Sequence, residues 1–334
     1  MGGYFRTFVL LAMLTAIFVA AGSAIGGRSG AMVALVVAAG MNLFAWWGSA
    51  GMVLRMHNAQ PLTEADAPRL FGMVHQLAQR AGLPMPALYL IHEDQPNAFA
   101  TGRGPSDAAV AVNSGLVNMM SEEQVAGVVA HELAHIKHRD TLVMSIAATL
   151  SGAIGMLAQF GGMFGNSRDR RNGGSAIAAL ALMILGPIAA MLVQMAISRS
   201  REYEADREGA EICGDPEWLA SALERLESYK DSAVNEGAEA NPATAHMFII
   251  NPLHGFSMQS IFATHPATQE RVARLRMMRP SGGVYLEHAS QGARGPWGGK
   301  GGGTPPAKGG SPPPAKGNSP WTNPGGGKPR SPWG

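Results

Sequence analysis

The sequence predicts a mainly α-helical integral membrane protein with about four transmembrane helices and a soluble part that contains a small β-sheet. Three observations carry this prediction: four long stretches without Asp, Glu, Lys or Arg, a helix with two histidines four residues apart, and two short strand patterns. The charge-free stretches cover residues 7–27, 29–54, 141–167 and 172–198. Each can cross a hydrocarbon core of about 30 Å, which takes roughly 20 helical residues.

The first two stretches are separated by one charged residue, Arg28, and predict a transmembrane hairpin. Arg6, the apolar run after it and the small residues 21–24 also fit a cleaved signal peptide. Because a second apolar span follows immediately, we expect the first to stay as an anchor. In the third and fourth stretches, which contain glycines and Pro187, buried helices of a soluble domain are the alternative.

Residues 58–140, between the hairpins, predict a small soluble unit. Residues 70–81 have helical apolar spacing and end before a glycine. Residues 87–91 and 108–113 predict short strands, which the segment 97–102 joins.

A strand at a sheet edge can bind an extended peptide by main-chain hydrogen bonds. Asn97, Phe99 and Ala100 are therefore candidate substrate-binding residues, although a purely structural role fits the same pattern.

The third feature is a predicted helix that begins at a capping box, with Ser121 as N-cap and Gln124 three residues later. It contains His131-Glu132-Leu133-Ala134-His135, the H-E-x-x-H pattern. Two histidines four apart share one helix face and can bind one Zn²⁺, with the glutamate directed at a water on the metal. This predicts His131 and His135 as metal ligands and Glu132 as the catalytic base.

A catalytic zinc site needs a third protein ligand and one open position. The best candidates are the acidic residues of a second predicted helix, Glu202, Glu204 and Asp206. Composition and spacing do not choose among them. Glu202 and Asp206 lie four apart on one helix face, so one can bind the metal while the other orients a ligand.

Both halves of this site must meet, so the segments 141–167 and 172–198 should form a hairpin whose two ends lie on one side of the membrane. Eight basic residues near the membrane ends fall on that side and four on the other, which favours an active site in the cytoplasm. The eight are Arg6, Arg55, Arg69, Lys137, Arg139, Arg199, Arg201 and Arg207; the four are Arg28, Arg168, Arg170 and Arg171. The single cysteine, Cys213, excludes an internal disulfide and fits a reducing compartment.

The C-terminal segment, residues 289–334, is rich in Gly, Pro, Ser and Lys and predicts a disordered tail. Its net charge is +6, so the chain's net charge of +2 conceals −4 in the remainder. With Trp297, Trp321 and Trp333 among the charges, the tail could contact anionic lipid weakly; a passive solubilising tail is the alternative.

These motifs together resemble the HtpX family of membrane-embedded zinc metalloproteases, which are related to the CAAX prenyl proteases. The resemblance covers residues 1 to about 285. It rests on Asn97-Ala98-Phe99-Ala100, Val112-Asn113-Ser114-Gly115-Leu116, the stretch from His131 to Asp140, the stretch from Ser198 to Asp206, Asn251-Pro252-Leu253 and the stretch from Thr264 to Val272.

The resemblance implies a cytosolic zincin-like (gluzincin) catalytic domain with one Zn²⁺ per subunit. It implies that Glu202 is the third zinc ligand and that Asp206 orients a ligand. His265 and Arg271 are candidate stabilisers of the transition state. The pair His265-Pro266 also fits the start of a helix, which is the structural alternative.

The function predicted from the resemblance is a multi-pass endopeptidase of the bacterial cytoplasmic (inner) membrane that cleaves misfolded or damaged membrane proteins in quality control and stress response. Its partners would be unfolded membrane proteins and the lipid bilayer, and no nucleic acid. The alternative is a non-proteolytic adaptor in which zinc only holds the two halves together while clients bind.

The predicted organisation is a transmembrane hairpin (1–57), a first catalytic part (58–140), a second transmembrane hairpin (141–198), a second catalytic part (199–288) and the tail (289–334).

Overall fold

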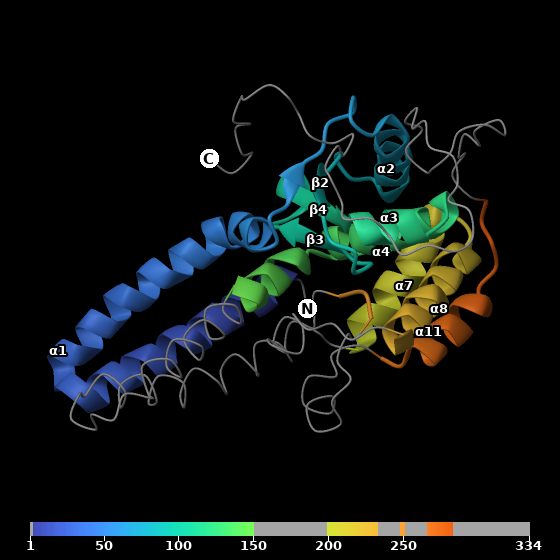
Figure 1. Ribbon diagram of the computed structural model, residues 1–334. Helices are drawn as coiled ribbons and strands as arrows, with labels where there is room; N and C mark the ends of the chain where they lie inside the picture. The colour runs from blue at the N-terminus through green and yellow to red at the C-terminus, as the bar shows by residue number, and fades with distance from the viewer. Residues whose placement is uncertain (1–2, 150–198, 233–247, 251–265, 283–334) are drawn as a thin grey trace.

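The computed structural model describes residues 3–149, 199–232, 248–250 and 266–282. The fourth predicted span, most of the third, His265 and the tail lie outside the described residues. Helix α1 (Gly3–Met56) forms two arms that lie side by side and extend away from the sheet (Figure 1). The arms meet at Gly26 and Gly27, where Gly27 has φ 57° and ψ −141°, a conformation open to glycine. The first two predicted stretches therefore form a helical hairpin.

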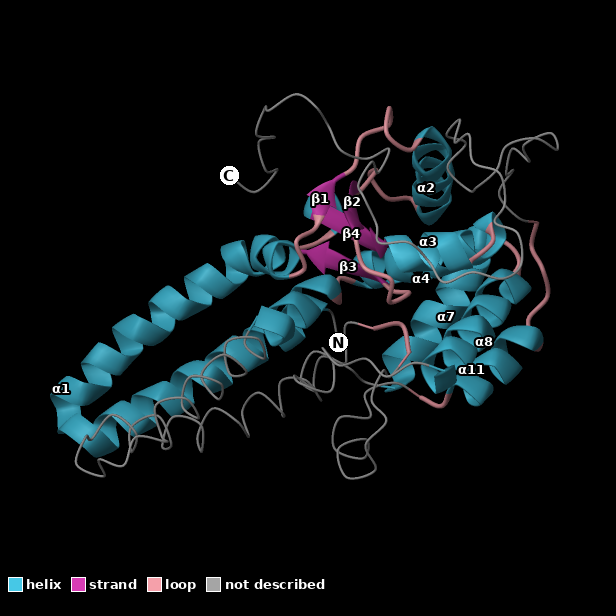
Figure 2. Cartoon of the chain, in the orientation of Figure 1, coloured by secondary structure: helices cyan, strands magenta, loops and turns pink. Residues whose placement is uncertain are grey.

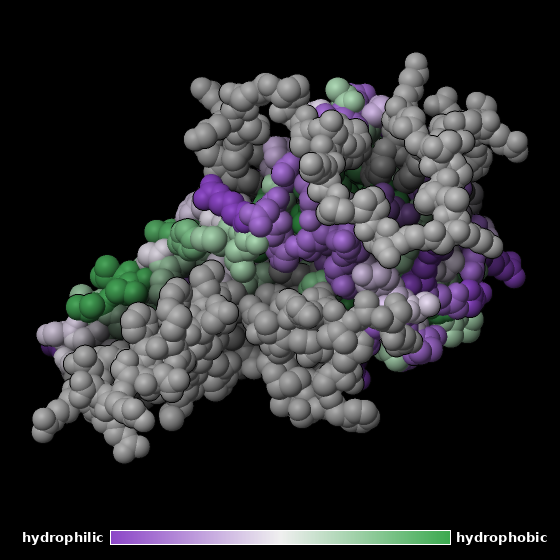
Figure 3. All heavy atoms as spheres, in the orientation of Figure 1, coloured by the Kyte–Doolittle hydropathy of each residue, from purple (hydrophilic) through white to green (hydrophobic). Residues whose placement is uncertain are grey.

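The longer arm of α1, Gly26–Met56, is long and apolar enough to cross a membrane, and Tyr4–Ala20 forms a shorter apolar helix. Only 11% of the most apolar window of the longer arm is buried, unlike the core helix of a soluble protein. Its exposed side chains include Met32, Val36 and Trp47. Figure 3 shows apolar residues gathered on the visible part of this arm, whereas hydrophilic residues gather over the rest of the described chain.

A four-stranded mixed sheet follows α1, in the order β1-β2-β4-β3. Its strands are β1 (Gln60–Pro61), β2 (Ala87–Ile91), β3 (Ala98–Gly102) and β4 (Ala108–Asn113). The two predicted strands are confirmed, and they pair in parallel. The segment expected only to join them is itself a strand, antiparallel to β4. Its sequence gives a mixed signal, because Phe99 and Thr101 favour a strand whereas the two alanines and Gly102 do not, and pairing with β4 completes the strand.

The sheet is buried on both faces. One face packs in the main core with α2, α4, α7 and α8; its strand residues are Leu88, Leu90, Ala98, Ala100, Ala108, Val110 and Val112. The other face packs against the end of α1 and Ala148; its strand residues are Tyr89, Ile91, Phe99, Ala109 and Ala111. Val53 and Leu54 are the contributions of α1. The sheet thus joins the main core to the apolar hairpin.

The helices beyond the sheet are α2 (Pro68–Ala81), α3 (Ser114–Met119), α4 (Glu122–His138), α7 (Arg199–Cys213), α8 (Pro216–Ser232) and α11 (Thr268–Arg276), with a 3₁₀ turn η1 (Pro105–Asp107) before β4. Helix α4 contacts α2, α7, α8 and β3 (Figure 2). Its burial is almost complete from Val125 to Ile136. The histidine-bearing helix is therefore the centre of the soluble part.

Two glycines allow α4 to approach its neighbours at backbone distance. A Cβ atom on Gly209 of α7 would lie 2.9 Å from both Cα and N of His131. A Cβ atom on Gly127 of α4 would lie 2.6 Å from N of Leu219 in α8. The separation between α4 and α7 is consequently set by main-chain contact at His131.

Strand β3 is also fixed by residues 141–149, which are helical and follow α4 after two residues, Arg139 and Asp140. Thr141 Oγ1 donates to Gly102 O at 3.0 Å, and the hydroxyls of Thr101 and Ser145 lie 2.7 Å apart. Leu142 and Ile146, on the same turns, pack with Leu10 and Leu14 of α1. These contacts hold the edge strand in place relative to α1.

Candidate metal centre

Helix α4 begins and ends at defined caps. The predicted capping box is present: Ser121 Oγ accepts from Gln124 N at 3.3 Å, and Gln124 Oε1 accepts from Ser121 N at 3.2 Å. At the other end Arg139 is left-handed, with φ 60°, and its N–H donates to Ile136 O. The next N–H, of Asp140, donates to His135 O at 3.0 Å. This is a Schellman motif with arginine where glycine is usual.

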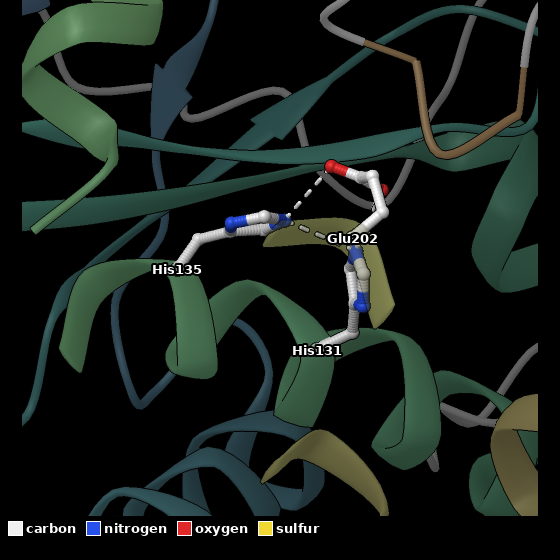
Figure 4. Close-up of side chains that lie close together, drawn as sticks. All are labelled: His131, His135 and Glu202. Carbon is white, nitrogen blue, oxygen red and sulfur yellow. Dashed lines mark hydrogen bonds and ion pairs between the residues drawn. The ribbon is translucent and has the colours of Figure 1, made fainter. Parts of the chain in front are cut away.

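Three side chains from α4 and α7 point at one position (Figure 4). His131, His135 and Glu202 are buried, and their ligand atoms all lie within 4.8 Å of one another. The two Nε2 atoms are 3.2 Å apart. Glu202 Oε2 lies 3.8 Å from His131 Nε2, and Oε1 lies 3.6 Å from His135 Nε2. The helix face expected for the two histidines is confirmed, and α7 brings Glu202 to it.

This arrangement fits zinc. Bonds of about 2.0–2.1 Å in a tetrahedron put ligand atoms about 3.3 Å apart, close to the distances here. Two imidazoles and one carboxylate are a catalytic donor set, with a fourth position left for water or substrate. Burial lowers the pKa of His135, but hydrogen bonding to Asp140 and the charge of Glu202 outweigh it and raise this pKa to about 9. The surrounding carboxylates therefore favour a cation at this point.

The Nδ1 atom of each ligand histidine faces a buried carboxylate. His131 Nδ1 lies 3.1 Å from Asp206 Oδ1, and His135 Nδ1 lies 3.4 Å from Asp140 Oδ2. A carboxylate in this position keeps the Nδ1 proton and leaves Nε2 free to bind a metal.

Asp206 is held in turn by Arg271 of α11, whose side chain is fully buried. Arg271 Nε and Nη2 donate to the two carboxylate oxygens at 2.8 and 2.7 Å. Burial raises the pKa of Asp206, but the charge and hydrogen bonds of Arg271 outweigh it and lower this pKa to about 2. Arg271 also donates to Ile249 O at 2.7 Å, and its Nη2 lies 3.8 Å from Glu202 Oε2.

Glu132 is buried beside the ligands, between the histidine helix and the edge strand. Its Oε2 accepts a 2.8 Å hydrogen bond from the backbone N–H of Ala100. Burial raises the pKa of Glu132, and the charges of His131 and His135 oppose that shift. A carboxyl whose proton affinity is raised suits proton transfer near neutral pH.

The three candidate substrate-binding residues lie in different settings. Asn97 Oδ1 accepts from Ile249 N at 3.3 Å, so its side chain holds the segment 248–250. Phe99 lies on the sheet face that meets α1, with its ring 5.3 Å from that of His57. Ala100 lies on the α4 face and contacts Glu132 through its backbone.

Sequence reasoning gave no individual role to Asp140, Arg201 or Ile249. Arg201 donates to both oxygens of Asp140, which lies five residues after His135. The short spacing between Asp140 and His135 is a local signal that could have identified the aspartate. For Ile249 no local signal exists, because its partners are distant in the chain.

Two comparisons with known proteins bear on this centre. The model for peptidase family M48 matches residues 64–279, more than half of the chain. Among solved structures, the crystal structure of S. mikatae Ste24p is similar with 19% sequence identity and a TM-score of 0.44. That alignment covers 80% of this chain and 62% of the Ste24p chain, so this chain spans less than two thirds of that relative.

The matched region runs from before α2 to just beyond α11 and includes every residue of the metal centre described above. His131 and His135 on α4 and Glu202 on α7 form a buried triad that can hold zinc, and the triad lies within the region matched by this peptidase family. The chain belongs to peptidase family M48.

Proposed function

We propose that this chain is a membrane-bound zinc endopeptidase of the HtpX type, which cleaves misfolded or damaged membrane proteins at the cytosolic membrane surface. The observation that carries the proposal is a buried glutamate, Glu132, next to a three-ligand zinc set in a family of peptidases. An adaptor in which zinc is only structural has no need for a buried carboxylate there.

Zinc, when bound, acidifies a water molecule and polarises the scissile carbonyl. Glu132 takes the proton from the attacking water and passes it to the departing amine. The hydrogen bond from Ala100 N–H holds one oxygen of Glu132 while this happens. Asp206 keeps the proton on His131 Nδ1, and Arg271 keeps Asp206 charged.

Stabilisation of the tetrahedral intermediate needs a donor near the scissile carbonyl. Arg271 is buried close to Glu202, but its guanidinium already holds Asp206 and Ile249 O. We therefore assign its main role to orienting the metal ligands, and propose His265 as the donor to the developing oxyanion.

Strand β3 is the proposed substrate-binding edge, with Asn97, Phe99 and Ala100 shaping it. It is the outer strand on its side of the sheet, so an extended peptide can add to it by main-chain hydrogen bonds. Recognition through the main chain depends little on the side chains of the substrate, which suits a quality-control enzyme with many unfolded substrates.

The apolar arms of α1 support a membrane location, since their exposed side chains match a lipid environment. The excess of basic residues on the side of the zinc site supports a cytoplasmic active site in a multi-pass protein of the bacterial inner membrane. The basic tail adds weak contact with anionic lipid, and one zinc ion is bound per subunit.

The test compares the full chain with Glu132→Gln, both purified with a chelator and then given Zn²⁺. We expect the parent to cleave itself and an unfolded labelled protein, and the variant to bind zinc without cutting. Glu202→Gln should lose zinc, whereas Glu204→Gln is the matched control, because Glu204 is half exposed and pairs with Arg207. Equal cleavage by the parent and Glu132→Gln would contradict the mechanism, and a zinc-loaded parent that never cuts would favour the adaptor.

A further inference from the structure

His135 has a second contact to Asp140 besides the backbone bond that closes α4. The imidazole Nδ1 lies 3.4 Å from Asp140 Oδ2, and both side chains are buried. Because the backbone N–H of Asp140 donates to His135 O, main chain and side chain both return to the same histidine. The left-handed turn at Arg139 produces this geometry, since it reverses the chain within one residue.

Arg201 of α7 holds the carboxylate of Asp140. Its Nε donates to Oδ2 at 3.1 Å, its Nη2 bonds Oδ1, and Nη2 also reaches His138 O at 3.4 Å. A guanidinium fork that binds both oxygens fixes the plane of a carboxylate better than a point charge does. It also compensates a charge that would otherwise be costly to bury.

We propose that Asp140 and Arg201 are a positioning pair for the zinc ligand His135, equivalent to Asp206 and Arg271 on His131. This inference rests on the zinc site of the proposed function. The Asp140 carboxylate keeps the proton on Nδ1 and sets the ring angle, so that Nε2 faces the metal. Arg201 acts through Asp140 by fixing its orientation.

The pair also links, next to the metal site, the two parts of the chain that flank the segment between α4 and α7. Asp140 immediately precedes the helical residues 141–149, and Arg201 immediately precedes the ligand Glu202. The segment between α4 and α7 is 139–198; Asp140 lies at its start, and Arg201 lies just after its end. The ion pair therefore ties the entry to that segment and the return from it to one zinc ligand.

A second ion pair between α4 and α7 provides a matched control. Lys137 bonds Glu208 at 2.5 Å, and the Lys137 side chain is 42% exposed. This pair joins α4 to α7 through Lys137 and Glu208, and Glu208 also lies 3.4 Å from Nε2 of His138, which is not a zinc ligand. If Asp140 only held α4 to α7, removing the Glu208 charge would affect zinc in the same way.

The experiment uses the full chain with Glu132→Gln, which avoids self-cleavage, and measures zinc affinity by competition with a chromogenic chelator. Asp140→Asn should weaken zinc binding about 10–100-fold and shift the visible spectrum of the Co²⁺-substituted protein. Arg201→Met should weaken it similarly, yet add nothing further in the Asp140→Asn background. Glu208→Gln should leave both affinity and spectrum unchanged.

Thermal unfolding of the metal-free proteins checks that each variant is folded. If Arg201→Met alone unfolds because the Asp140 charge is left uncompensated, the double variant with Asp140→Asn replaces it. A folded Asp140→Asn protein with parental zinc affinity and Co²⁺ spectrum would overturn the inference, as would an equal loss in Glu208→Gln. A parent that binds no zinc would overturn the proposed function as well, so the two failures are distinguishable.

Discussion

The backbone N–H of Ala100 donates to Glu132 Oε2 at 2.8 Å, which joins the edge strand directly to the proposed catalytic base. This N–H points away from β4, because along a strand of an antiparallel pair the N–H groups of successive residues alternate between the partner strand and the opposite edge. A substrate strand that adds to β3 would lie along the same edge that binds Glu132. Strand β3 would then position both the base and the peptide.

Replacing the donor at position 100 tests that alignment. In Ala100→Pro the N–H that bonds Glu132 is lost, and no N–H directed at β4 is removed, because Ala100 N–H lies on the outer edge of the pair. We expect kcat to fall about 10–100-fold because the base is mispositioned, with zinc content unchanged. Ala100→Val keeps the N–H and is the control. Single-turnover cleavage of a labelled unfolded protein is the measurement, and parental kcat in the proline variant would contradict the role of this bond.

The close approach of Gly209 to His131 predicts an unusual cost for adding a methyl group. Glycine to alanine in a helix normally stabilises by about 1 kcal/mol. In Gly209→Ala the new Cβ meets the His131 backbone at 2.9 Å, so we expect destabilisation of about 1–3 kcal/mol and weaker zinc binding. Gly72→Ala in α2 is the control, because nothing lies within 4 Å of its added Cβ, and it should stabilise. Thermal unfolding and zinc content are measured together; a stabilised, zinc-replete Gly209→Ala protein would refute the packing argument.

The buried pair of Arg271 and Asp206 predicts a large effect from removing one partner. Arg271→Met removes the guanidinium that compensates the buried Asp206 carboxylate and leaves it only the contact with His131, which should cost about 3–5 kcal/mol. Arg207 pairs with Glu204 and Glu211 on the exposed side of α7, and Arg207→Met should cost about 1 kcal/mol or less. Denaturant unfolding of the metal-free proteins measures both. Similar costs for the two variants would show that burial of the pair is unimportant.

The thiol of Cys213 should stay protonated and unreactive in the folded protein. Burial raises its pKa from the ordinary 9.0 to about 11, and Sγ lies 3.2 Å from Asp215 O as a hydrogen-bond donor. We expect iodoacetamide to modify it at pH 8 only after unfolding.

The same shift gives a stability effect with a defined sign. The unfolded chain releases this proton near pH 9 and the folded protein near pH 11, so the thiol's contribution is complete below pH 9 and is lost as pH rises to 11. The loss should be on the order of 2 kcal/mol. Cys213→Ala should lack that part of the pH dependence, and parallel alkaline unfolding curves for the two proteins would argue against it.

Local signals in the sequence predicted the local parts of this structure. The capping box at Ser121 and Gln124 is contained within four residues, and the helix begins there. The strands β2 and β4 were predicted from their own apolar runs, whereas the segment of β3 was predicted only to join them, and its place in the sheet comes from pairing with β4.

The third zinc ligand could be narrowed down from residue spacing to three acidic residues but not identified. Glu202, Glu204 and Asp206 are equivalent as acids, but small residues mark the face of α7 that can approach α4. Ala205, Gly209 and Ala210 are buried on the side of Glu202 and Asp206, while Glu204 is on the exposed side with Arg207. The contacts of Arg201 with Asp140 and of Arg271 with Asp206 join residues more than 60 positions apart, and nothing in either local sequence specifies them.

The sheet face that packs against the end of α1 is apolar, and it makes the peptidase part inseparable from the hairpin. Tyr89, Ile91 and Phe99 are covered by Val53 and Leu54, which are among the last residues of α1. A cut in the turn after Met56 would not release a water-soluble protease. It would leave a fragment in which the sheet exposes the apolar face next to β3, the proposed substrate-binding edge. Such a fragment would be prone to aggregate and to lose the zinc. Self-digestion near that turn would therefore act as an irreversible off-switch for the molecule that suffers it.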